Sequence, residues 1–179
     1  ISRPGKQCVQ GLVNLLPTSE EVGGNVMVPG SHKFFKNIPQ EYEERLARLP
    51  LGVDHFRFPN DDPKLSSQKP IMCHMEIGDM LLWDSRTIHC SNSGTSLSKG
   101  TKELVRAASL ICMMPKEKSN PEVIKKRREA VKKVISTTNW SDKFRNADEF
   151  PVILEANDRG KYKWPDKPNL SAYQKDLVG

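Results

Sequence analysis

Apolar residues gather in short runs along the chain, and each run is bounded by glycine, proline or polar residues. The first two runs are CVQGLVNLLP at residues 8–17 and NVMVPG at residues 25–30. The intervening TSEEVGG has the polar residues and paired glycines that are typical of a turn. This pattern predicts two neighbouring antiparallel strands.

Three further runs follow in the middle of the chain. They are IMCHMEI at residues 71–77, DMLLWD at residues 79–84, which continues toward RTIHC, and ELVRAASLICMM at residues 103–114. Short strands bounded by turn residues are typical of β-sandwiches and barrels. We therefore predict an all-β core with peripheral helices.

Helical patterns interrupt and follow the strands. NIPQEYEERLARLP at residues 37–50 predicts a short amphipathic helix that ends at Pro50, whereas residues 56–70 lack periodicity and predict a loop. SNPEVIKKRREAVKKVIS at residues 119–136 has a cap, an early proline and one apolar side, which predicts a basic amphipathic helix. Residues 137–179 are polar and predict an extended tail packed on the core.

The composition is that of a globular domain. The 179 residues are 36% hydrophobic and 28% charged, which predicts a single domain over residues 1–179. No apolar run approaches the roughly 20 residues that span a bilayer, so a membrane protein is not expected. No signal peptide precedes the first strand, although the start at Ile1 looks cut. An intracellular, cytoplasmic location is expected, with the four cysteines as buried free thiols because their spacing includes no CxxC.

Positive charge is concentrated in one segment. The net charge is +6, and KKRREAVKK at residues 125–133 is its densest part. Such a helix face is usually solvated, which is the favoured interpretation, and an acidic partner bound by residues 121–135 is the alternative. No aromatic residue interleaves the basic ones, so stacking on nucleic-acid bases is unsupported.

Four histidines are candidates for metal binding: His32, His55, His74 and His89. In a strand, His74 and Glu76 would point to the same side, and a His-x-carboxylate pair is part of the 2-His-1-carboxylate iron site. Polar groups that face solvent just before the IGD turn are the favoured alternative for this pair.

His89 has a more informative setting, because an arginine follows on the next apolar run. Arg106 is the second residue of VRAASLICMM, and a buried guanidinium requires an anionic partner unless the side chain reaches water. A histidine and an arginine on successive strands would let a metal ion and a dicarboxylate share one barrel mouth. The alternative is a structural histidine at a strand end.

Three segments, in this order, resemble the phytanoyl-CoA dioxygenase family of Fe(II)/2-oxoglutarate-dependent oxygenases. They are VQGLVNLLPTSEEVGGNVMVPGSHK, GDMLLWDSRTIHCSNSG and RAASLICMMP, and the resemblance covers roughly residues 5–140. It implies a double-stranded β-helix, which is a jelly-roll barrel open at one mouth. It also implies Fe(II), 2-oxoglutarate as cosubstrate, dioxygen, and a small-molecule substrate.

The resemblance assigns roles to particular residues. His89 matches the distal histidine ligand of the iron, Arg106 matches the residue that pairs with the far carboxylate of 2-oxoglutarate, and Ser91 matches a position that hydrogen-bonds the cosubstrate. The insertion between His89 and Arg106 is longer than usual, which makes Lys99 or Lys102 fallback partners. Further candidates for substrate or cosubstrate contact are Gln10 and Arg86, with strand pairing or the surface as their alternative, and His32 is expected to shape its loop.

The family's His-x-Asp motif should stand shortly before CVQGLVNLL, and no His-x-Asp occurs in the sequence. The preferred explanation is that these ligands belong to the native protein outside the given residues. Three hypotheses therefore stand: an oxygenase that hydroxylates a small organic or acyl substrate, an iron-free binding or scaffold module, and a basic adaptor.

Overall fold

The computed structural model divides into two compact units, residues 1–111 and residues 112–179. The prediction of one domain over the whole chain stays a prediction. The residues that the structure describes are 7–49, 55–59, 61–95, 100, 103–133, 140–144 and 169–177.

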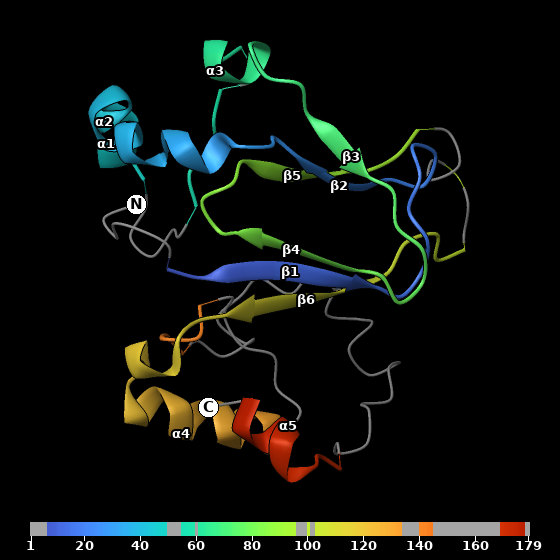
Figure 1. Cartoon of the computed structure of the whole chain (residues 1–179), viewed down its shortest axis with the longest axis vertical. Helices are drawn as coiled ribbons and strands as arrows, with labels where there is room; N and C mark the ends of the chain where they lie inside the picture. Colours follow the sequence, from blue (N-terminus) through green and yellow to red (C-terminus); the bar gives the residue numbers. More distant parts are fainter. Residues whose placement is uncertain are drawn as a thin grey trace. The chain divides into compact units, whose positions relative to one another are not determined.

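The described strands form two three-stranded sheets (Figure 1). The first sheet has the order β4-β1-β6, with β4 at Met80–Asp84, β1 at Val9–Asn14 and β6 at Ala108–Met113. The second has the order β3-β2-β5, with β3 at Ile71–Cys73, β2 at Gly24–Met27 and β5 at His89–Asn92. A β-sheet core with flanking helices is therefore confirmed, and the described strands do not close into a barrel.

Strands that follow one another in sequence mostly lie in different sheets. β1 pairs antiparallel with β4, and β2 lies between β3 and β5, both antiparallel to it. The prediction that the runs at 8–17 and 25–30 form neighbouring strands is therefore wrong.

The physical reason lies in the connection between β1 and β2. The backbone N–H groups of Leu15 and Leu16 donate to the Ala107 carbonyl, before β6. The buried Thr18 hydroxyl donates to the Cys73 carbonyl over 3.0 Å and accepts from the Met75 N–H over 2.9 Å. These distant partners carry the chain from one sheet to the other, so it does not close a hairpin.

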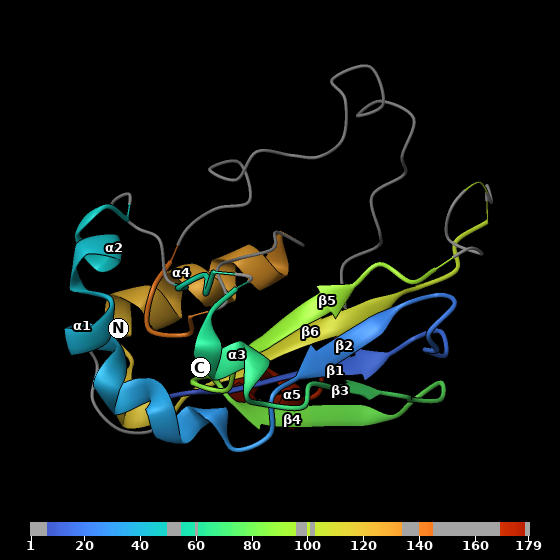
Figure 2. The ribbon, with the colours of Figure 1, turned by 90° about the horizontal axis from the view of Figure 1, so that it is seen from above.

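A helical excursion occupies residues 28–70, between β2 and β3. It contains the 3-10 helix η1 (Ser31–Asn37) and the helices α1 (Ile38–Glu41), α2 (Glu43–Ala47) and α3 (Pro63–Ser66). In Figures 1 and 2, α1 and α2 lie beyond one end of the strands. The single helix predicted for residues 37–50 is thus two short helices that meet at Tyr42, whose φ of −126° is not helical.

The loop predicted at residues 56–70 contains α3, and the prediction missed this helix. The buried Asp62 caps it by accepting the Lys64 N–H over 2.8 Å, and Pro63 takes the first helical position. The ring of Tyr42 contacts the rings of Phe56 and Phe58, with centroids 5.1 and 5.5 Å away. The excursion therefore has a small aromatic core of its own.

In the second unit, the predicted basic helix is confirmed as α4, Pro121–Lys132. Asn120 caps it by accepting the Glu122 N–H, and the half-buried Arg127 donates to the carbonyls of Trp140 and Lys143. The 3-10 helix η2 (Lys116–Lys118) precedes α4, and α5 (Ala172–Leu177) lies within the range predicted as an extended tail. Most of that tail and residues 134–139 lie outside the described residues. In the part of the chain that is described, no helix has the length and apolarity to cross a bilayer.

Candidate functional site

His89 is the first residue of β5, and hydrogen bonds hold the backbone just before it. Its partner across the sheet is Met27 at the end of β2. The Val28 N–H donates to the Ile88 carbonyl over 2.9 Å, and the Ile88 N–H donates to the hydroxyl oxygen of the buried Ser31 over 2.7 Å. The segment PGSHK, at residues 29–33, therefore positions the backbone that precedes His89.

The imidazole of His89 is oriented by a local hydrogen bond. Its Nδ1 atom lies 2.7 Å from the Thr87 carbonyl oxygen. A carbonyl can only accept, so a neutral ring carries its proton on Nδ1 and a lone pair on Nε2. The same arrangement of a backbone carbonyl and a ring N–H fixes the tautomer of histidines that bind metals.

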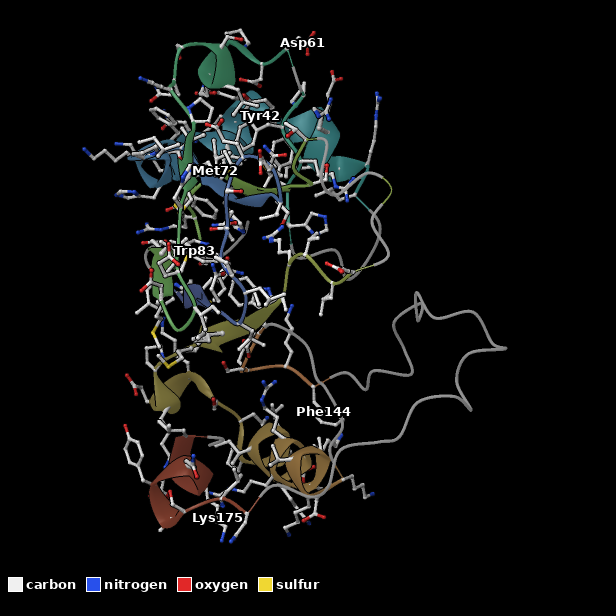
Figure 3. All side chains as sticks on the ribbon, turned by 90° about the vertical axis from the view of Figure 1, so that its right-hand side faces the viewer. Tyr42, Asp61, Met72, Trp83, Phe144 and Lys175 are labelled. Carbon is white, nitrogen blue, oxygen red and sulfur yellow. The ribbon has the colours of Figure 1, made fainter. Side chains whose placement is uncertain are left out.

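Trp83 is the second contact of the His89 ring. The two ring centroids are 5.1 Å apart, with the planes inclined at 56°. Trp83 lies on β4, opposite Gln10 of β1, and its Nε1–H donates to Gln10 Oε1 over 3.2 Å. Figure 3 labels Trp83 on its strand. Because the contact joins the two sheets, the His89 side of β5 faces the sheet β4-β1-β6.

Gln10 and His89 are both sequence-predicted site residues, and they come together through Trp83, which was not predicted. The available signal was the alternation along residues 80–84, which places Trp83 on the same face as Leu81. Gln10 is half-buried and already accepts the indole N–H, so it is part of the support of His89.

Ser91 lies on the same strand as His89, and Arg106 contacts the far end of that strand. Ser91 is two residues beyond His89 and therefore points to the same side of β5. The Arg106 Nη1 donates to the Asn92 carbonyl over a long 3.4 Å, at the other end of β5. Arg106 precedes β6 by two residues, and the fallback candidates Lys99 and Lys102 lie outside the described residues.

Arg86 has an acidic partner of its own. Its Nε donates to Asp84 Oδ1 over 2.9 Å and its Nη2 donates to Asp84 Oδ2 over 2.6 Å. The hydrogen bonds from Arg86 hold the pKa of the Asp84 carboxyl below its usual range, against the opposing effect of burial, and the nearby charge of His32 adds to this lowering. Two of the five N–H donors of Arg86 are thus committed to Asp84, and they brace the turn that leads to His89.

His74 and Glu76 do not share a strand face, because β3 ends at Cys73. The backbone turns there since the Met75 N–H is taken by Thr18 and the Gly78 N–H donates to the Asn14 carbonyl. Both side chains are exposed. The strand geometry assumed for this pair was therefore wrong.

Other ligand types are dispersed over the part of the chain that the structure describes. Within these residues, no three His, Cys, Asp or Glu side chains form a group that could hold a metal ion. None of the four cysteines forms a disulfide; Cys8 is buried as predicted, whereas Cys90 is exposed, contrary to the prediction. His89 is therefore the sequence-predicted ligand whose orientation the structure defines in most detail.

Comparisons with known proteins identify the family of the chain. Residues 2–101 match the family described as phytanoyl-CoA dioxygenase (PhyH). The protein named "Ava biosynthesis cluster protein O", from Aspergillus versicolor, is 31% identical over an alignment of 134 residues, and the match covers 69% of this chain. The chain spans 40% of the length of that relative. No solved structure gives a significant match. Because the family match covers more than half of its residues, the chain belongs to the phytanoyl-CoA dioxygenase family.

Proposed function

We propose that the protein is an Fe(II)- and 2-oxoglutarate-dependent dioxygenase that hydroxylates a small organic or acyl substrate. Membership in a dioxygenase family supports oxygenase activity in general. The observation that carries the proposal is the orientation of His89, whose Nδ1 lies against the Thr87 carbonyl. His89 Nε2 is the atom that binds the iron.

The residues near His89 suit this role chemically. Imidazole nitrogen is a good ligand for iron, and a backbone carbonyl on the other ring nitrogen raises the basicity of the ligand. The family's remaining ligands, a histidine and an aspartate in a His-x-Asp motif, come from the native protein outside residues 1–179. The relative, of which this chain matches 40%, has length to spare for such a segment.

Ser91 and Arg106 bind the cosubstrate. Three residue steps separate His89 from Asn92, about 10 Å along the strand, and Arg106 contacts the Asn92 end. A five-carbon keto acid held near His89 by one end can therefore point its far carboxylate toward Arg106. The planar guanidinium donates to both oxygens of a carboxylate, and Ser91 offers a hydroxyl between the two points.

The cofactors supply the oxidation chemistry, and the residues of the chain hold the metal ion and the cosubstrate in position. When bound, Fe(II) and 2-oxoglutarate let dioxygen oxidise a substrate C–H bond, with release of succinate and carbon dioxide. His89 holds the metal, Arg106 and Ser91 fix the keto acid, and the apolar ring of Trp83 limits access of water to one side of His89.

A double-stranded β-helix completes this proposal at the level of the fold. Successive strands of the chain alternate between two antiparallel sheets, except β2 and β3, as in a jelly roll. This alternation supports the fold, with the space between the sheets as the cosubstrate site.

The excursion at residues 28–70 contacts the substrate. Its two ends meet at Met27, which pairs with Ile71 on one side and with His89 on the other. We therefore expect the loop at residues 54–70 to contact the substrate at the strand end where His89 lies. The tail after residue 137 is a second candidate, and most of it lies outside the described residues, as do residues 54 and 60. The relative's name refers to a biosynthesis cluster, which favours a small metabolite or its acyl precursor.

The test is carried out on the natural protein with iron and 2-oxoglutarate. We expect tight Fe(II) binding and 2-oxoglutarate-dependent release of succinate, both lost in His89→Ala and both kept in His74→Ala, an exposed histidine outside the strands. If His89→Ala binds iron and releases succinate like the parent, the proposal is wrong. Absence of iron binding in the parent would favour an iron-free binding module instead. Salt-sensitive capture of a polyanion, lost when Lys125 and Lys126 are replaced, would favour the basic adaptor.

A further inference from the structure

We propose that Trp83, held in place by Gln10, is a positioning residue for the metal ligand His89. The inference rests on the proposed role of His89 in binding iron. The resemblance to the family assigns no role to Trp83. Two contacts of its indole ring, with Gln10 and with His89, support the inference.

The first step is the anchoring of the indole. Gln10 and Trp83 are direct partners across β1 and β4, so their side chains lie on the same face of the sheet. The Trp83 Nε1–H donates to Gln10 Oε1 over 3.2 Å. This bond selects one of the two orientations that the indole could take about its second side-chain torsion.

The second step is the exposure of the ligand. All four residues of β5 are exposed, and in the described sheet this strand has one neighbour, β2. Close packing therefore does not restrict the His89 side chain. The Thr87 carbonyl restrains the Nδ1 edge, and the Trp83 ring, 5.1 Å away between centroids, restrains the face. With both restraints, Nε2 keeps one direction before any metal arrives.

A ligand that is oriented in advance binds metal more tightly, because less side-chain freedom is lost on binding. Removal of an outer residue that orients a ligand typically weakens metal affinity by about 10- to 100-fold. We expect a loss at the lower end for Trp83, about tenfold, since the Thr87 carbonyl remains.

The experiment combines metal titration with nitrogen NMR of the histidine rings in the natural protein. Mn(II) is the titrant, and the metal-free protein is used for NMR, with the His89 signal assigned by its loss in His89→Ala. Trp83→Leu should weaken Mn(II) binding about tenfold and shift the His89 ring nitrogens toward an average of both tautomers. Trp83→Phe keeps an aromatic face and should recover most of the affinity.

Gln10 provides the sharper test because it acts only through the indole N–H. Gln10→Ala should resemble Trp83→Phe, and the double variant Gln10→Ala/Trp83→Phe should be no weaker than Trp83→Phe alone. Leu82→Ala is the control, since Leu82 is the neighbour of Trp83 on β4, points to the other face and is exposed. It should leave both readouts unchanged.

The outcomes separate this inference from the proposed function. Parent-like Mn(II) affinity and parent-like ring signals in Trp83→Leu would overturn the positioning role while His89 remained a ligand. An equal loss in Leu82→Ala would overturn it as well, because the effect would then belong to the strand. If His89→Ala binds Mn(II) like the parent, the proposed function fails, and the metal-free ring signals still decide whether Trp83 orients His89.

Discussion

The Tyr42 hydroxyl donates a 2.6 Å hydrogen bond to Oδ2 of Asp62, a carboxylate that is only 5% exposed. Tyr42 stands where α1 meets α2, and Asp62 caps α3. The bond therefore joins the two halves of the excursion between β2 and β3. In Figure 3 Tyr42 is labelled among the side chains of this region.

Replacement of Tyr42 by phenylalanine should loosen this excursion without emptying its aromatic core. A hydrogen bond to a charged group contributes roughly 1.5–3 kcal/mol, and Asp62 still accepts from Lys64 in the variant. We expect the free energy of unfolding to fall by about 1–2 kcal/mol, measured by urea denaturation. Tyr173→Phe is the control, because Tyr173 is 73% exposed on α5, and it should change nothing measurable.

The same residue predicts a loss of stability at high pH. Burial, then the hydrogen bond to Asp62, raises the pKa of Tyr42 from 10.0 to about 12. Because the pKa is higher in the folded state, the stabilisation is complete below the unfolded value and disappears as pH rises toward the folded value. Between about pH 10 and 12 the parent should lose stability more steeply than Tyr42→Phe, as read from urea midpoints across that range. Parallel curves would contradict the assignment.

Thr18 bridges two backbone groups, which makes it sensitive to loss of its hydroxyl. Thr18→Val keeps the shape and leaves the Cys73 carbonyl and the Met75 N–H without their partner. An unsatisfied buried polar group costs about 1–3 kcal/mol, so we expect a loss of about 3 kcal/mol in the free energy of unfolding. Thr18→Ser retains the hydroxyl and should lose much less. Equal losses in the two variants would contradict this assignment, because Thr18→Ser keeps both hydrogen bonds.

Gly94 is required by both its conformation and its neighbours. Its φ is +78°, and an added Cβ would lie 2.4 Å from the Glu21 carbonyl oxygen. Gly78 is a matched control, with φ of +87° and no atom within 4 Å of an added Cβ. Gly78→Ala should cost about 1–2 kcal/mol from backbone strain alone. Gly94→Ala should cost clearly more in thermal unfolding, because backbone atoms must also shift.

The proposed role of Arg106 should require a guanidinium group, which the ammonium group of lysine does not replace. If it pairs with the far carboxylate of 2-oxoglutarate, Arg106→Lys loses the bidentate geometry, and the KM for 2-oxoglutarate should rise about tenfold. The substrate KM should change little. Arg48→Lys makes the same change at a side chain that is 81% exposed and pairs with Glu44, so it should leave both constants unaltered. An unchanged KM in Arg106→Lys would move the role to Lys99 or Lys102.

Periodicity and turn chemistry were sufficient to predict the positions of most elements. The runs at 79–84 and 103–114 contain β4 and β6, and the capped segment at 119–136 contains α4. Sheet partners could not be predicted, because Thr18 and Leu15 bind groups more than fifty residues away. The break in the predicted helix at Tyr42 has the same kind of cause, since the ring and the hydroxyl of Tyr42 contact residues that lie beyond the helix.

The candidate site divides in a similar way. His89 and Arg106 were predicted because they lie in the three segments whose order resembles the family. Trp83 was not predicted because its contact with His89 joins two different sheets. The alternation along a strand predicts only the face of the sheet on which a side chain lies. The pair His74 and Glu76 was predicted on a strand that ends at Cys73, before either residue, because the Met75 N–H donates to Thr18.

The strand connectivity also has a consequence for how the chain acquires its structure. β1 can pair with β4 only when the chain closes the loop of residues 15–79. Even the consecutive strands β2 and β3 can pair only when the excursion at residues 28–70 is closed. Each pairing therefore costs the conformational entropy of closing a long loop before the hydrogen bonds between the strands contribute to stability. We expect folding on a scale of roughly milliseconds to seconds, with unpaired strands exposed meanwhile. Dilute, slow refolding should therefore recover more native protein than rapid refolding at high concentration.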